Sequence, residues 1–160
     1  MKRFSLFLFV AIIISALVVA GCSSSLPDDG SGAASGMSGT SVQIFKSSSC
    51  GCCDLYAQYI GKNNFDVEAS NVMDIAQIKS QYGVPKSMES CHTTVVDGYF
   101  VEGHMPKEAI EKLLSEKPDI KGIAMPGMPS GSPGMPGGKQ GPFIIYAVHT
   151  DGSTSEFMRI

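Results

Sequence analysis

Three short segments hold the cysteines and histidines that could do chemistry, and they are Cys50-Gly51-Cys52-Cys53, Cys91-His92 and His104-Met105. Cys50 and Cys53 form a C-x-x-C pair at the turn between a predicted strand and a predicted helix. The partial positive charge and the free N–H groups of a helix N-terminus favour the thiolate form of such cysteines. Because thiolate is both a nucleophile and a metal ligand, this position suits redox exchange as well as soft-metal binding. Cys52 adds a third, closely spaced thiol, which a plain dithiol oxidoreductase does not need.

A second thiol segment and an isolated histidine could complete a metal site. Cys91 and His92 are predicted to enter the third strand beside the N-terminus of the first helix, where a thiol and an imidazole would face the C-x-x-C pair. His104 comes just before a predicted helix and can reach across the end of the sheet; a surface histidine is the alternative. Thiolate and imidazole donors favour Cu(I), with Zn(II) as a second candidate. The predicted metal ligands are Cys50, Cys52, Cys53, Cys91, His92 and His104.

Disulfide bonds are the alternative use of these four cysteines. Exported domains commonly pair their thiols, and four is an even number. The neighbours Cys52 and Cys53 cannot readily satisfy disulfide geometry with each other, so a bridge would run to Cys50 or to Cys91.

The methionines of a Gly/Pro-rich segment after Asp119 are candidate secondary copper ligands. Met125, Met128 and Met135 follow no helical or strand period that would assign them to a core, so exposed side chains are expected. Thioethers are soft donors that suit Cu(I). Methionine also fills gaps in hydrophobic cores, and packing is therefore the alternative.

The elements that must position these residues alternate between strand and helix patterns. Predicted strands cover residues 42–45, 65–69, 93–96 and 99–101, and predicted helices begin at Cys52, near Asp74 and at Pro106. This β-α-β-α-β-β-α order predicts an α/β, thioredoxin-like domain with a small mixed sheet. Residues 143–148 and 155–160, joined by Asp151-Gly152, predict an extra C-terminal hairpin that extends the sheet or packs over it.

The N-terminal region reads as an export signal. A basic start and an apolar run up to Gly21 predict a signal peptide over residues 1–21. Val19-Ala20-Gly21 followed by Cys22 resembles a lipobox, in which Cys22 would carry acyl chains such as palmitate. Residues 22–41 then form a predicted Gly/Ser tether, and residues 42–160 the folded domain. The domain would face the periplasm or the cell exterior on a membrane anchor. Ser23 favours the outer over the inner membrane, because an aspartate there would resemble an inner-membrane retention signal.

Charge excludes one class of function. The chain of 160 residues has a net charge of −3, and without Lys2 and Arg3 of the signal it keeps 10 basic against 15 acidic side chains. Arg159 is the one arginine that remains. Such a surface cannot bind a phosphate backbone by counterion release, so nucleic-acid binding is not expected.

Five segments together resemble the DUF411 family of small, often exported, metal-binding proteins associated with copper. They are residues 46–53, 83–85, 90–96, 98–104 and 123–135, and the resemblance spans roughly residues 42–160. It implies a thioredoxin-like metal-binding module with the six predicted Cys and His ligands at the family's motif positions. The family often has a Trp and a His in the first helix, where this chain has Tyr56 and Tyr59. Any ligand role of that helical His is therefore absent.

These residues are compatible with two main classes of function and with a third that is less favoured. The first is a non-enzymatic lipoprotein that binds Cu(I) and sequesters it or exchanges it with a copper-donor or copper-acceptor protein. Cys50, Cys53 and Cys91 would be its thiolate ligands, completed by His92 or His104. The second is a thiol–disulfide oxidoreductase in which Cys50 attacks and Cys53 resolves. The third is a purely structural disulfide framework.

Overall fold

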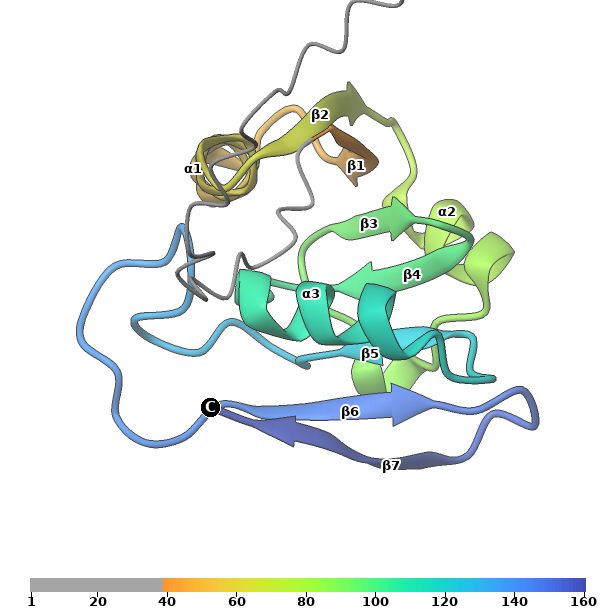
Figure 1. Ribbon diagram of the computed structural model, residues 1–160. Helices are drawn as coiled ribbons and strands as arrows, with labels where there is room; N and C mark the ends of the chain where they lie inside the picture. The colour runs from red at the N-terminus through yellow and green to blue at the C-terminus, as the bar shows by residue number, and fades with distance from the viewer. Residues whose placement is uncertain (1–38) are drawn as a thin grey trace, which may run out of the picture. The chain divides into compact units, whose positions relative to one another are not determined.

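The computed structural model describes residues 39–160, which form a seven-stranded sheet with three α-helices (Figure 1). The predicted signal peptide (1–21), the lipidation site Cys22 and most of the predicted tether lie outside these residues. The strands are β1 (Thr40–Lys46), β2 (Phe65–Asn71), β3 (Thr93–Val96), β4 (Tyr99–Glu102), β5 (Gly122–Ala124), β6 (Ile144–Val148) and β7 (Thr154–Arg159). The helices are α1 (Gly51–Lys62), α2 (Ile75–Tyr82) and α3 (Lys107–Glu116), with a short 3-10 turn η1 (Lys86–Met88).

The sheet is mixed, as predicted, and its order is β2-β1-β3-β4-β5-β6-β7. β1 is parallel to β2 and antiparallel to β3, and β4 is antiparallel to β3 and parallel to β5. The predicted element order from β1 to α3 is confirmed. The C-terminal hairpin β6–β7 extends the sheet through β5. β5 was not predicted from the sequence, because a strand of three residues is too short to show a period.

The two faces of the sheet carry different helices. The larger core contains apolar side chains of α1 and α3, such as Tyr56, Ile60 and Leu113, packed with Ile44 and Val101 of the sheet. A smaller cluster on the other face joins Phe100 and Val148 to Val84, which follows α2. Figure 1 shows α3 in front of the sheet and α2 behind it.

Local signals explain where the helices begin and end. The Asp74 carboxylate accepts hydrogen bonds from the amides of Ala76 and Gln77, which caps the N-terminus of α2. Gly83 ends that helix with φ of 70°, a left-handed conformation that glycine adopts without steric cost. α1 begins at Gly51, with Cys50 as its N-cap residue, so the cysteine cluster sits on the helix N-terminus, as predicted.

Every helix among residues 39–160 falls short of the length and hydrophobicity that a membrane span requires.

Candidate metal centre

The N-terminus of α1 holds three of the four cysteines. Cys50 and Cys53 are joined by a disulfide bond, whereas Cys52 and Cys91 are free thiols within residues 39–160. The bridge links the pair that the oxidoreductase hypothesis predicts, and it agrees with the expectation that Cys52 and Cys53 do not pair with each other. In this oxidised form Cys50 and Cys53 are not thiolates, so the predicted site, with thiolates from Cys50, Cys53 and Cys91, requires reduction of the bridge.

Four sulfur atoms lie together at this point. Cys52 Sγ lies 3.5 Å from Cys50 Sγ, and Cys91 Sγ lies 3.6 Å from Cys53 Sγ. All four lie within 4.8 Å of one another. Cys53 is buried, and the other three cysteines are half-exposed. The sheet topology brings Cys91 to this cluster because the residues just before β3 lie beside the end of β1, which leads into α1.

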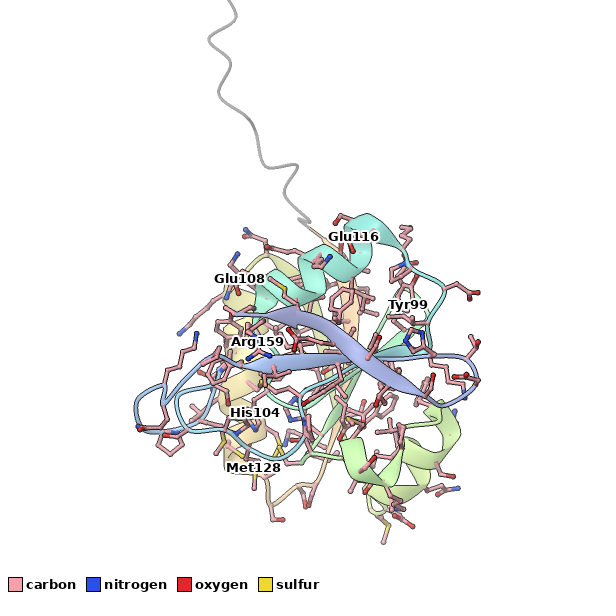
Figure 2. The ribbon with its side chains drawn as sticks, turned by 90° about the horizontal axis from the view of Figure 1, so that it is seen from below. Tyr99, His104, Glu108, Glu116, Met128 and Arg159 are labelled. Carbon is pink, nitrogen blue, oxygen red and sulfur yellow. A yellow bond between two sulfur atoms is a disulfide. The ribbon has the colours of Figure 1, made fainter. Side chains whose placement is uncertain are left out.

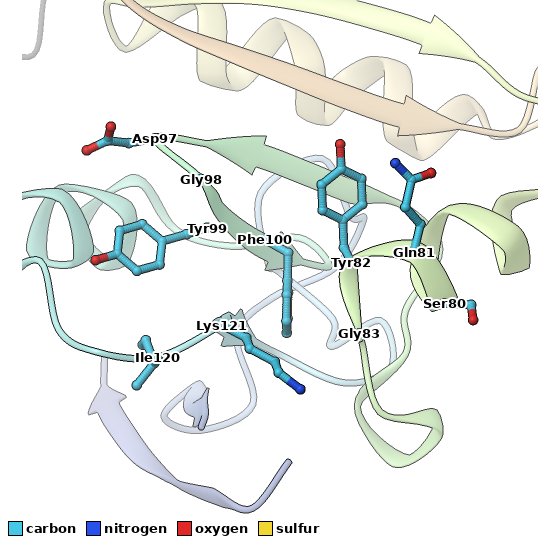
Figure 3. Close-up of a pocket in the computed structure, with 10 residues that line it drawn as sticks. All are labelled: Ser80, Gln81, Tyr82, Gly83, Asp97, Gly98, Tyr99, Phe100, Ile120 and Lys121. Carbon is cyan, nitrogen blue, oxygen red and sulfur yellow. The ribbon is translucent and has the colours of Figure 1, made fainter. Parts of the chain in front are cut away.

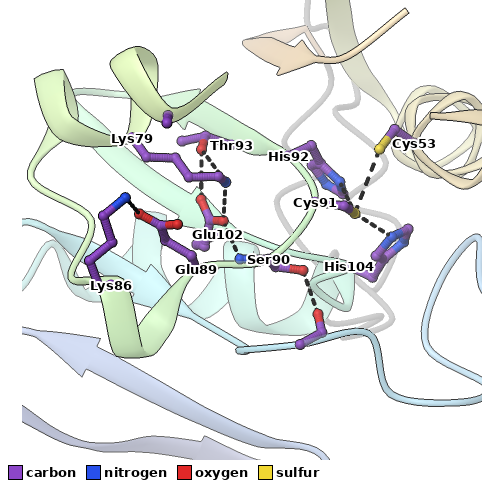
Figure 4. Close-up of polar contacts among 12 residues, drawn as sticks. Cys53, Lys79, Lys86, Glu89, Ser90, Cys91, His92, Thr93, Glu102 and His104 are labelled. Carbon is purple, nitrogen blue, oxygen red and sulfur yellow. Dashed lines mark hydrogen bonds and ion pairs between the residues drawn. The ribbon is translucent and has the colours of Figure 1, made fainter. Parts of the chain in front are cut away.

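Cys91 also belongs to a second group, formed with His92 and His104. Its Sγ lies 3.0 Å from His104 Nε2 and 3.3 Å from His92 Nδ1 (Figure 4). His92 directly precedes β3 and His104 follows β4, so the antiparallel β3–β4 hairpin places both at the same end. All six predicted ligands are therefore neighbours, and Cys91 links the four-sulfur group to the two imidazoles.

The hydrogen bonds of His104 determine its tautomer. His104 Nδ1 lies 2.7 Å from the carbonyl oxygen of Pro133. A carbonyl only accepts, so Nδ1 carries the proton and donates. Nε2 is then a free lone pair directed at Cys91 Sγ, as metal-binding histidines are commonly arranged. Burial lowers the pKa of His104, which keeps the ring neutral near pH 7.

His92 is fully buried and incompletely satisfied. Burial, followed by the nearby positive charges of His104 and Lys79, lowers the pKa of His92 to about 3, so the ring is neutral. Its Nε2 atom has no hydrogen-bond partner within the described residues. The ring nitrogen that faces the Cys91 thiol is the other one, Nδ1, at 3.3 Å. Nδ1 is therefore the His92 atom that is placed to join Cys91 in holding a metal ion.

Tyr56 forms the wall behind both imidazoles. Its ring centroid lies 4.4 Å from that of His92 and 5.6 Å from that of His104, and the side chain is fully buried. Burial raises the pKa of Tyr56 far above its ordinary value, so the phenol stays neutral. Tyr59 has a different role, because its hydroxyl accepts a hydrogen bond from the Lys107 amide and joins α1 to α3.

A buried ion pair, not predicted from the sequence, supports the segment before Cys91. Lys79 of α2 and Glu102 of β4 pair with exposed fractions of 3% and 0%, and Glu102 Oε2 accepts from Thr93 Oγ1 at 2.6 Å (Figure 4). Glu102 Oε1 accepts from the Ser90 amide at 2.6 Å. Burial raises the pKa of Glu102, and the charge of Lys79 opposes that rise. The signal in the sequence was a lysine among the apolar residues of a predicted helix.

The Gly/Pro-rich segment packs against the site and places its methionines differently. Met125 is 2% exposed within the larger core, so its expected exposure was wrong: the segment begins directly after the buried strand β5. Met128, labelled in Figure 2, is 55% exposed, and Met135 is half-buried. A Cβ on Gly134 would lie 2.8 Å from the Tyr56 amide nitrogen, which shows how closely the segment approaches α1. Copper binding by these methionines stays a prediction.

An open pocket of about 490 Å³ lies elsewhere, at the Asp97-Gly98 turn of the β3–β4 hairpin (Figure 3). This turn is at the opposite end of the hairpin from Cys91 and His104. The pocket is lined by aromatic and charged side chains such as Tyr82, Phe100 and Lys121 and by no cysteine or histidine. It is therefore separate from the candidate metal centre.

Similarity to known proteins agrees with this geometry. Residues 88–135 match the family described as "Protein of unknown function, DUF411". Two solved structures of the copper resistance protein CopG, Form 2 and Form 1, are each 39% identical to the chain. Each covers 76% of this chain and is itself covered over 98% of its length, with TM-scores of 0.72 and 0.71. The chain belongs to the DUF411 family. No curated protein matches it.

The DUF411 match covers half of the candidate site. It contains Cys91, His92 and His104 together with the methionines of the Gly/Pro-rich segment, and it begins after the C-x-x-C of α1. The predicted DUF411 membership is thereby confirmed. The Cys/His cluster of this DUF411 protein could hold a metal ion, and its structural neighbours are copper resistance proteins.

Proposed function

We propose that this protein is an extracytoplasmic lipoprotein that binds a soft metal ion, Cu(I) in particular, and sequesters or delivers copper without catalysing a reaction. The observation that carries the proposal is the convergence of four sulfurs and two imidazoles on Cys91. The similarity to copper resistance protein CopG supports copper as the metal.

The donor set suits Cu(I) in the reduced protein. Cys50, Cys53 and Cys91 supply thiolates, and His104 Nε2 or His92 completes a three- or four-coordinate site. Soft thiolate ligands favour Cu(I), and Zn(II), which also accepts sulfur and nitrogen, is the second candidate. Met128, exposed on the segment that adjoins the site, is a candidate for a secondary soft site with Met125 and Met135.

Exposure of the cluster supports transfer to a partner protein. Cys50, Cys52 and Cys91 are half-exposed, so an incoming thiolate of a copper-donor or copper-acceptor protein could reach the metal. Cys52 would be the alternative ligand during such an exchange, because its Sγ lies 3.5 Å from that of Cys50.

The anchoring part of the proposal concerns residues 1–41. Cleavage before Cys22 and acylation would hold the domain on a membrane, with the outer membrane favoured in a cell that has two. Replacing Cys22 by Ser should move the mature protein from the membrane fraction to the soluble fraction and abolish incorporation of labelled palmitate. An unchanged membrane fraction without acylation would contradict the lipoprotein assignment.

An anaerobic Cu(I) competition titration tests the function. The full-length protein with Cys22→Ser, fully reduced and held in detergent, competes with a chromophoric Cu(I) chelator, and a parallel titration with Zn(II) tests the metal preference. We expect tight binding of at least one Cu(I), weakened at least tenfold by Cys91→Ser, because Cys91 belongs to both ligand groups. His149→Gln, which alters a histidine at the β6–β7 turn, is the matched control and should bind as the parent. Failure of the reduced protein to compete would refute the proposal.

The second candidate function is a thiol–disulfide oxidoreductase on a thioredoxin-like fold. The Cys50–Cys53 bridge at the N-terminus of α1, and the β1-α1-β2-α2-β3-β4-α3 order, favour it. This function predicts rapid reduction of an external disulfide by the reduced, copper-free protein, and its loss in Cys50→Ser. Tight Cu(I) binding with negligible reductase turnover would decide for the metal-binding function.

A further inference from the structure

Each free thiol of the cluster lies next to a different sulfur of the disulfide. Cys52 Sγ contacts Cys50 Sγ at 3.5 Å, and Cys91 Sγ contacts Cys53 Sγ at 3.6 Å. Thiol–disulfide exchange proceeds when a thiolate attacks one sulfur of a bridge and displaces the other. Both partners of such a reaction are therefore already in contact within the chain.

Cys91 is better placed for this attack than Cys52. Burial raises the pKa of the Cys91 thiol to about 11, so its proton needs an acceptor in direct contact. Cys91 Sγ has one, because it lies 3.0 Å from His104 Nε2, the nitrogen that the Pro133 hydrogen bond leaves unprotonated. Cys52 has no imidazole within hydrogen-bond distance among the described residues. An attack by Cys52 would also have to close a bridge between residues only two apart in the chain, at the start of α1.

We propose that Cys91 exchanges internally with the Cys50–Cys53 disulfide, so that the bridge moves to Cys53–Cys91 and Cys50 is released. The proton of Cys91 passes to His104 Nε2, the sulfur–sulfur bond to Cys53 forms as the bond to Cys50 breaks, and Cys50 leaves as a thiolate. One disulfide and two free sulfurs are present before and after the step. The exchange therefore needs no external oxidant or reductant.

The position of Cys50 at the N-terminus of α1 stabilises the thiolate that the exchange releases. Cys50 is the N-cap residue of α1, so its sulfur lies at the positive end of the helix dipole, while its carbonyl oxygen accepts the amides of Cys53 and Asp54. A helix N-terminus stabilises a thiolate. Cys50 is also half-exposed, whereas Cys53, the sulfur shared by both bridges, is fully buried.

The exchange changes which thiols are available at the surface. Before it, the free thiols are Cys52 and Cys91; after it, they are Cys50 and Cys52, a C-x-C pair at one helix end. The oxidised protein would thus keep two soft donors for Cu(I) while one disulfide remains intact. This consequence rests on the proposed copper function, but the exchange itself does not.

Tryptic mapping distinguishes the two bridges, because the cleavage sites separate their cysteines. Cys50, Cys52 and Cys53 share peptide 47–62, and Cys91 is in peptide 87–107. The full-length, oxidised and copper-free protein is incubated anaerobically at pH 8 with N-ethylmaleimide, quenched in acid and digested. We expect peptides 47–62 and 87–107 to become linked, with maleimide on Cys50 and Cys52.

Variants supply the controls. In Cys91→Ser, whose peptide 87–107 has no cysteine to link, Cys50 should take up no maleimide, whereas the linked peptide should persist in Cys52→Ser, because exchange requires the attacking sulfur and not the bystander. Oxidised Cys50→Ser should form the Cys53–Cys91 bridge as its main product, since those sulfurs already lie 3.6 Å apart.

Maleimide on Cys52 and Cys91 alone, with no linked peptide in the wild type, would overturn the proposal. So would release of Cys53, which would indicate attack by Cys52, or failure of Cys50→Ser to form the linked product. Because copper is absent, a protein that binds Cu(I) tightly but forms no linked peptide would refute the exchange and leave the proposed function standing.

Discussion

Replacing Lys79 by Met removes one partner of the buried ion pair that supports the segment before Cys91. Lys79 and Glu102 are 3% and 0% exposed, so solvent neither screens their attraction nor rehydrates the carboxylate that is left behind. Removing one partner of a buried pair typically costs about 3–5 kcal/mol. We therefore expect the free energy of unfolding of Lys79→Met to fall by about 4 kcal/mol.

Urea unfolding of the oxidised, copper-free protein measures this loss. With an m value of about 2 kcal/mol/M, the midpoint should fall by about 2 M. Lys112→Met is the matched control, because Lys112, which also lies over the Phe157 ring, forms an i,i+4 pair with Glu116 at partly exposed positions of α3. Exposed pairs of this kind contribute about 0.3–0.5 kcal/mol. The double variant Lys79→Met/Glu102→Gln, which keeps an acceptor for the Ser90 amide, should recover much of the loss.

The pH dependence provides a second, independent readout. Burial raises the pKa of Glu102, and Lys79 is the strongest influence that lowers it, so Lys79→Met leaves only the hydrogen bonds from Thr93 and Ser90 to oppose the rise. A carboxyl whose folded-state pKa is raised contributes stability at low pH and loses it as the pH rises through that pKa. The deficit of Lys79→Met should therefore shrink as the pH falls from 7 toward 4.5, the ordinary pKa of the carboxyl. A loss no larger than that of Lys112→Met, or a deficit independent of pH, would refute the role assigned to this pair.

Three further predictions concern the packing around the site. The pKa of His92 is lowered to about 3, so between about pH 6.5 and pH 3 the unfolded chain takes up a proton that the folded chain does not. The copper-free protein should therefore lose stability as the pH falls through this range. Urea midpoints measured along an acid titration should show a smaller loss in His92→Phe. Met105→Ala, at a fully buried core position, should cost about 2–5 kcal/mol in thermal unfolding, whereas Met128→Ala at an exposed position should change stability by less than about 0.5 kcal/mol; equal effects would contradict the assigned packing. Gly134→Ala adds a Cβ at φ of 79° against the backbone of α1, so the Gly/Pro-rich segment should detach from that helix. Trypsin should then cleave after Lys139 several-fold faster. An unchanged cleavage rate would show that the position of the segment does not depend on this contact.

Unfolding and copper titration together distinguish residues that hold the metal centre in place from residues that bind the metal. Lys79→Met acts through the Ser90 amide on the segment that carries Cys91, without removing any predicted ligand. It should therefore weaken copper binding less than Cys91→Ser does, even where it destabilises the fold more.

Local patterns were enough to predict most elements and the composition of the site. Periodicity and turn residues act over a few residues, and so the strand and helix order from β1 to α3 and the hairpin at Asp151-Gly152 could be predicted from the chain alone. Thiol and imidazole chemistry depends on residue type, which is why six candidate ligands could be named before their positions were known.

Contacts between distant segments could not be predicted in the same way. The position of Cys91 against Cys53, 38 residues earlier, follows from the register of β3 on β1, and the tautomer of His104 follows from a carbonyl at Pro133. The burial of Met125 depends on β5, which has too few residues to show a period. Residue types and local patterns are therefore enough to identify the donors and the elements that carry them. Which sulfurs are bridged, which are in contact and which nitrogen faces them follows from the three-dimensional fold, because these depend on strand pairing between residues far apart in the chain.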